Sequence, residues 1–94
     1  MSDKDVYIAK MKLQLDELDT QMTILEARAE EAKDDARAKY KEEMAKLRDQ
    51  SKLAQGKLDN MKSATAEAWD ATVAEMEKIR DAFVHSFSYF KSQL

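Results

Sequence analysis

The stretch that decides the fold covers residues 8–36 and reads IAKMKLQLDELDTQMTILEARAEEAKDDA. Its apolar side chains recur at alternating steps of three and four residues, which is the pattern of a coiled coil held over about four heptads. A β-strand would alternate from one residue to the next, and no such alternation is present. We therefore predict an α-helix with one apolar stripe, formed by Ile8, Met11, Leu15, Leu18, Met22, Leu25, Ala29, Ala32 and Ala36.

The sequence around this stretch contains almost no residue that breaks a helix. The 94 residues include no proline and one glycine, Gly56. Charged residues make up 37% and hydrophobic residues 44%, and this mixture, with a regular apolar period, is typical of a long helix rather than of a disordered tail. We predict a helix over about residues 3–60, roughly 90 Å long at about 1.5 Å per residue.

Turn-forming residues cluster between residues 56 and 65, where Gly56, Asp59, Asn60, Ser63 and Thr65 interrupt the pattern. Beyond this cluster a second apolar stripe begins in a different phase and contains the tryptophan and the three phenylalanines of the chain. We predict a turn at residues 60–66 and a shorter, aromatic-rich helix over about residues 66–91. Its stripe contains Trp69, Val73, Met76, Ile79, Phe83, Phe87 and Phe90.

Two all-α architectures agree with these patterns, each within a single domain of residues 1–94. In a helical hairpin, the aromatic helix folds back along the long helix and gives its large side chains an intramolecular partner. In the alternative, one continuous helix runs almost from end to end and absorbs the change of phase as a change of pitch. We favour the hairpin, because the phase change and the turn-forming cluster fall at the same place.

Self-association is the expected source of further stability, because a chain of this length buries a modest core. We predict a homo-oligomer, in the simplest case a dimer. Parallel pairing would place no attractive charge pair at the flanking e and g positions of the first heptads, so antiparallel helices are favoured. Another helical protein is the second candidate partner. The predicted oligomer interface contains Ile8, Met11, Leu15, Leu18, Met22, Leu25, Ala29, Ala32, Ala36, Trp69, Met76, Phe83, Phe87 and Phe90.

Few residues of the chain are suited to catalysis or ligand binding. The net charge of -3 and the even mixture of charges give no basic patch for nucleic acid. A sequence without cysteine excludes thiol catalysis and zinc–cysteine sites, and one glycine cannot form a phosphate-binding loop. His85 follows Asp81 by one helical turn; whether this pair binds a metal stays open, because two ligands do not make a structural metal site. We expect no cofactor and no catalytic activity.

These observations favour a structural or interaction role, in which the chain is a spacer, a scaffold or a partner-binding coiled coil. The alternative is an amphipathic protein that binds lipid or membrane surfaces through residues 81–94, DAFVHSFSYFKSQL. A membrane partner is disfavoured, since Arg80 and Lys91 are the only strong cations from residue 79 onward and interfacial helices usually carry a basic face. The first residues contain no signal-peptide core and no apolar stretch approaches about 20 residues, so we expect a cytoplasmic protein.

The opening SDKDVYIAKMKLQLDEL, the middle rich in alanine, glutamate and lysine, and AEAWD before an aromatic end resemble a group of short bacterial coiled-coil proteins of unknown function. The resemblance covers most of the chain. It implies a bacterial, soluble, helical homo-oligomer, and it supplies no reaction, ligand or site residue.

Overall fold

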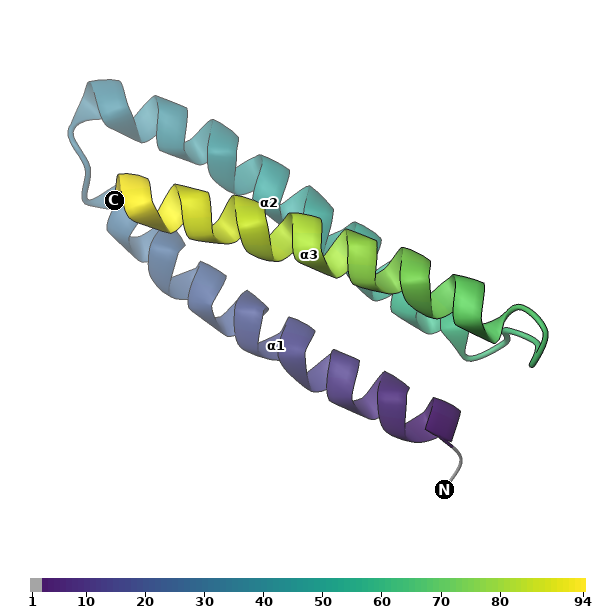
Figure 1. The fold of residues 1–94 in the computed structure, drawn as a ribbon. Helices are drawn as coiled ribbons and strands as arrows, with labels where there is room; N and C mark the ends of the chain where they lie inside the picture. The colour runs from purple at the N-terminus through teal and green to yellow at the C-terminus, as the bar shows by residue number, and fades with distance from the viewer. Residues whose placement is uncertain (1–2) are drawn as a thin grey trace.

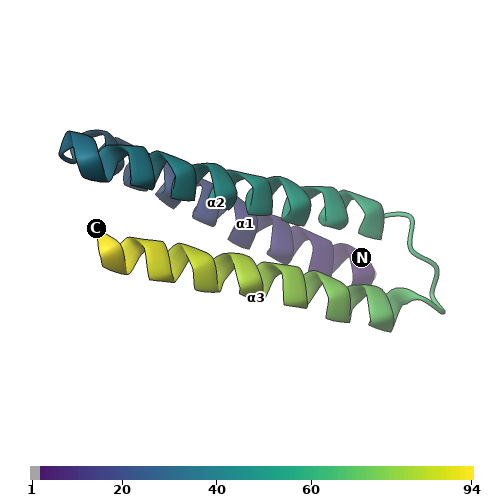
Figure 2. The same ribbon diagram turned by 90° about the horizontal axis from the view of Figure 1, so that it is seen from above.

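The computed structural model describes residues 3–94 and consists of three α-helices that lie side by side (Figure 1). The helices are α1 (Asp3–Glu30), α2 (Asp34–Met61) and α3 (Trp69–Gln93). α1 and α3 point the same way, and α2 runs against both (Figures 1 and 2). The molecule measures 51 × 20 × 18 Å along its principal axes. No strand occurs among residues 3–94, and the all-α prediction is confirmed.

The helix predicted over residues 3–60 is wrong as one element, because the chain reverses after Glu30 and starts α2 at Asp34. Lys33, before the first turn of α2, has extended dihedral angles, φ -61° and ψ 152°, and its carbonyl oxygen accepts the Arg37 amide at 2.8 Å. Residues 31–33 favour helix by themselves. We attribute the reversal to packing, since it buries the apolar stripes of α1 and α2 against each other within one chain.

The second connection covers residues 62–68, close to the turn predicted at residues 60–66. Its polar side chains bond to the nearby backbone: Ser63 Oγ donates to the Asn60 carbonyl oxygen at 3.1 Å, and Thr65 Oγ1 accepts the Ala68 amide at 3.2 Å. α3 then begins at Trp69 rather than at residue 66 and returns along α2 (Figure 2). The alternative of one continuous helix is therefore wrong.

The core lies along the middle of the bundle and is apolar except for Ser51, whose hydroxyl donates to the Asp19 carboxylate. α2 packs along its length against both α1 and α3, whereas α1 and α3 touch each other much less. The aromatic stripe of α3 points inward, and Phe83 has no exposed surface. The buried apolar side chains are Met11, Leu15, Met22, Leu25, Ala29, Met44, Leu47, Ala54, Leu58, Met61, Met76, Phe83, Phe87 and Phe90.

Candidate functional site

The residues predicted to form an oligomer interface mostly form the core of the single chain. The structure buries Met11, Leu15, Met22, Leu25, Ala29, Met76, Phe83, Phe87 and Phe90. The remaining five are half-buried: Ile8, Leu18, Ala32, Ala36 and Trp69. A side chain buried between helices of its own chain cannot contact a second chain while those helices stay in place. The surface left for a partner is therefore the outside of the bundle.

α1 has a second apolar face, turned away from the bundle. This outer face consists of Val6, Leu13 and Ile24, with 36%, 62% and 55% of their surface exposed. The three residues are spaced by about two and about three helical turns, so they share one side of α1. Exposed Ala9 and Ala27 lie on the same side. This face was not predicted from the sequence; the heptad spacing of Val6 and Leu13 is the signal that could have identified it.

A row of polar contacts, the α1–α2 polar ladder, runs along one edge of these two helices and marks the register in which they pair. Its ion pairs are exposed, so each contributes at most about 1 kcal/mol. The contacts follow one another in opposite order along the two antiparallel helices, as a single register requires. From one end to the other, the pairs are Lys12 with Gln55, Asp19 with Ser51, Glu26 with Arg48, and Glu30 with Lys41.

Tyr7 connects α1 to α3 at the end of the bundle where α1 begins. Its hydroxyl donates to Glu77 Oε1 at 3.4 Å, and its ring lies edge-on to Trp69. Burial, and after it the neighbouring Glu77 carboxylate, raise the pKa of Tyr7 above its usual value of about 10. Both effects favour the neutral phenol. Tyr7 is therefore a packed hydrogen-bond donor rather than an acid–base group at neutral pH.

Asp81 and His85, the titratable side chains of α3 that the sequence singles out, are both exposed. The Asp81 carboxylate accepts Arg80 Nη2 at 3.0 Å, and His85 is exposed one turn further on. Among residues 3–94, no group of three or more histidine, cysteine, aspartate or glutamate side chains is arranged to hold a metal ion. On another side of α3, Lys57 hydrogen-bonds to Glu75, and this bond and the lysine charge lower the pKa of that carboxyl.

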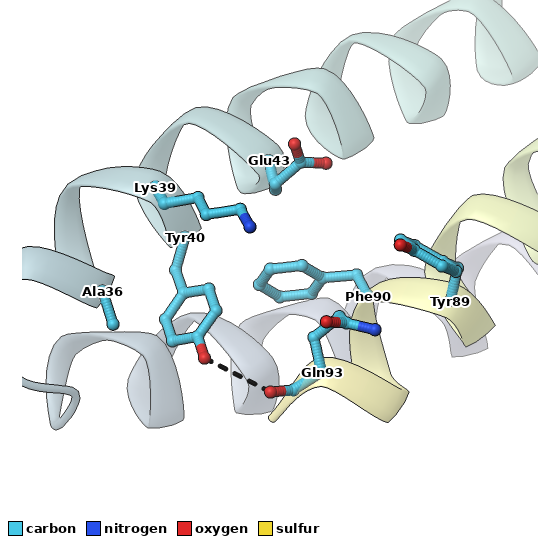
Figure 3. A pocket seen from close by; sticks show the side chains of 7 residues that line it. All are labelled: Ala36, Lys39, Tyr40, Glu43, Tyr89, Phe90 and Gln93. Carbon is cyan, nitrogen blue, oxygen red and sulfur yellow. Dashed lines mark hydrogen bonds between the residues drawn. The ribbon is translucent and has the colours of Figure 1, made fainter.

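A shallow cavity of about 310 Å³ opens between the start of α2 and the end of α3 (Figure 3). The rings of Tyr40 and Phe90 line it, with centroids 5.7 Å apart and planes at 84°. The Tyr40 hydroxyl donates to the Gln93 carbonyl oxygen at 3.2 Å, and Tyr89 borders the cavity with 64% of its surface exposed. Lys39 and Glu43 also line the cavity, so its wall combines aromatic rings with one charge of each sign (Figure 3).

The candidate binding surfaces described for residues 3–94 are thus the helix faces and the shallow cavity beside Tyr40 and Phe90. No helix among these residues contains an apolar stretch of the length that would span a bilayer. The resemblance to short bacterial coiled-coil proteins stays a prediction. Comparison of the chain with protein-family models, with curated proteins and with solved structures finds no match.

Proposed function

We propose that this chain is a structural and interaction protein of the cytoplasm, which associates with a second copy of itself and has no catalytic activity. The observation that carries the proposal is the outer face of α1, where Val6, Leu13 and Ile24 expose apolar side chains along one side of a helix. Protein partners commonly recognise a helix by such a row of apolar side chains. The paired molecule would be a rod-like spacer or scaffold.

The charges beside the outer face favour a second copy over other partners. Lys10 and Arg28 are interspersed with Asp16 and Glu17 along this exposed side of α1. Nucleic acid and anionic lipid need a basic face, whereas a surface of mixed sign suits a partner of mixed sign. A second copy supplies such a surface, and a two-fold axis lets one patch serve both chains. Two antiparallel α1 helices could then meet over about 42 Å, the length of 28 residues.

Substitution of two outer-face residues by lysine tests the proposal. Leu13→Lys combined with Ile24→Lys should shift sedimentation equilibrium at micromolar concentration toward the monomer, because like charges would then lie in the contact. Leu53→Lys is the matched control, since Leu53 is 60% exposed on α2 and has no large apolar neighbour one turn away. A wild-type chain that stays strictly monomeric while fully helical would overturn the proposal. Equal weakening by Leu53→Lys would overturn the role of the outer face.

Lipid binding is the competing function. The structure weakens the argument for it that the aromatic residues of the sequence provided. Phe83, Phe87 and Phe90 are buried, so the aromatic face expected to meet a membrane is turned into the core. We expect the chain to stay in the supernatant when vesicles containing anionic lipid are sedimented. Pelleting of the chain with these vesicles, abolished by Leu13→Lys, would replace self-association by lipid binding as the function of the outer face.

A further inference from the structure

We infer that two copies of this chain exchange α1. In the exchanged dimer, residues 31–33 become helical, and α1 and α2 join into one helix of residues 3–61. Each α1 then packs against α2 and α3 of the other copy. Exchange is a route of self-association that leaves the outer face of α1 free; it rests on the self-association in the proposed function and not on that face.

Residues 31–33, which connect α1 to α2, include no turn-forming residue. Glu31, Ala32 and Lys33 are all good helix formers. No residue of the described chain has a positive φ angle, so no special backbone conformation fixes the reversal. The connection of residues 62–68 differs, because Ser63 and Thr65 side chains bond to the backbone around it. The first reversal therefore depends on tertiary packing, which another copy can supply equally well.

The helix ends at this connection gain hydrogen bonds when it becomes helical. Lys33 caps α2 by position, but it makes no side-chain hydrogen bond to the first amides of the helix. At any helix end, the first four amides and the last four carbonyls have no partner within the helix. Joining α1 to α2 gives these groups partners four residues away, and it replaces the shorter-range bonds in which the Arg28 and Ala29 carbonyl oxygens accept the Glu31 and Ala32 amides at 3.1 and 3.2 Å. The exchanged form thus replaces two helix ends by continuous helix.

Exchange can keep the contacts of the α1–α2 polar ladder, with each pair then formed between two chains. α1 and α2 are antiparallel, so two long helices of residues 3–61 can pair with the same partners between chains (Figure 1). In the exchanged dimer, Asp19 of one chain would face Ser51 of the other, and residue 35 lies midway between these two positions in the sequence. The two-fold axis that relates the long helices therefore passes near Asp35 and Ala36. Ala32 and Ala36 lie close to this axis, and their small side chains let two helices approach closely there.

The end of α3 supplies a contact that only the exchanged dimer makes. Gln93 meets Tyr40 near the start of α2, and both ribbon views place the C-terminus beside the α1–α2 connection (Figures 1 and 2). A two-fold axis that relates antiparallel helices is perpendicular to their common plane, so both α3 helices lie on the same side of the pair. Their C-terminal ends then face each other across the axis. Tyr89 and Leu94, 64% and 40% exposed, lie at these ends.

A disulfide between chains tests the exchange directly. The natural sequence has no cysteine, so one chain carries Asp19→Cys and the other Ser51→Cys, at positions whose short side chains already touch. The two chains are unfolded together, refolded at high concentration and oxidised. We expect a heterodimer linked between positions 19 and 51. Mixing the chains after separate refolding in dilute solution should give much less of this product.

A proline at the start of α2 provides a variant that blocks exchange and keeps the single-chain fold. Asp34 is the first helical residue and follows the extended Lys33, which is the setting that proline tolerates best. Inside a continuous helix, the same proline removes a hydrogen bond and clashes with the preceding turn. Asp34→Ala is the matched control, because it also removes the carboxylate paired with Arg37 but favours helix. We expect no linked heterodimer with Asp34→Pro in both chains, and full linkage with Asp34→Ala.

The outcomes separate this inference from the proposed function. A dimer without the link between positions 19 and 51, formed equally by Asp34→Pro, overturns exchange and leaves association through the outer face of α1 standing. A linked dimer that persists with Leu13→Lys and Ile24→Lys supports exchange and overturns the role of the outer face. A chain that is monomeric after refolding at every concentration overturns both. Circular dichroism confirms in each case that the variant is helical.

Discussion

The ring of Tyr7 lies edge-on to the ring of Trp69, with centroids 5.7 Å apart and planes at 86°. This contact joins the beginning of α1 to the beginning of α3, two helices that otherwise touch little. Lys4 adds to it, with Nζ 5.9 Å from the centre of the Trp69 ring. An edge-to-face pair of this kind contributes about 0.5–1.5 kcal/mol beyond the area that it buries. Aromatic packing therefore holds α1 and α3 together at this end of the bundle.

Loss of the Tyr7 proton should lower the stability of the fold at alkaline pH. Its pKa is raised in the folded chain, first by burial and then by the Glu77 carboxylate. Below the usual value of about 10, both states keep the proton; above it the unfolded chain loses the proton first, so stability falls as the pH rises toward the folded pKa. Tyr7→Phe keeps the ring and removes this titration. In urea unfolding between about pH 8 and 11, the free energy of unfolding should fall more steeply for the wild type than for Tyr7→Phe. Equal slopes for the two proteins would contradict a raised pKa of Tyr7 in the folded chain.

Most of the core could be predicted from the sequence, because the apolar period is a local property of the chain. The spacing places Met11, Leu15, Met22 and Leu25 on one stripe, and all four are buried. The sequence does not tell whether this stripe packs against a helix of the same chain or of another chain, because the spacing of the stripe is the same in both cases. For that reason the predicted oligomer interface coincides with the core.

The reversal at residues 31–33 was not predictable from turn-forming residues, because none is present. Weaker signals mark it. Asp34 and Asp35 lie in the first turn of α2, and Arg28 lies in the last turn of α1, where each charge favours a helix end. The successive four-residue steps from Ala36 to Tyr40 and from Tyr40 to Met44 also depart from the alternation of three and four. These signals also occur inside long helices, so only the packing of the three stripes decides between a reversal and a continuous helix.

Phe83 should be among the most costly positions to truncate. It has no exposed surface and lies among the three helices, so Phe83→Ala should lower the free energy of unfolding by about 3–5 kcal/mol through lost burial and a cavity. Tyr89→Ala is the control, because Tyr89 is 64% exposed on the same helix. Its effect should stay within about 0.5 kcal/mol in urea unfolding of dilute protein. Similar losses for both variants would contradict the inward orientation of the α3 stripe.

Lys4 should stabilise the connection between α2 and α3. Its Nζ donates to the carbonyl oxygens of Lys62 and Ala64 at 2.8 and 2.9 Å. Lys4→Met keeps the length of the side chain and removes both hydrogen bonds, so we expect a loss of about 1 kcal/mol in this solvated setting. Hydrogen exchange should also become faster in residues 62–68. The exposed Lys10 of α1 provides the control, and Lys10→Met should leave that exchange unchanged.

Lys33→Asn should stabilise the single chain by supplying the cap that α2 lacks. Lys33 has the extended backbone of a capping residue but no side-chain hydrogen bond to the helix, and an asparagine oxygen can accept one of the free amides of the first turn. The expected gain is about 1 kcal/mol in urea unfolding of dilute protein. Lys52→Asn is the matched control, because the same substitution at an exposed position inside α2 lowers helix propensity and should destabilise by less than about 0.7 kcal/mol. Opposite signs for the two variants would locate the start of α2 at residue 34, whereas a loss at both positions would mean that residue 33 lies inside a continuous helix.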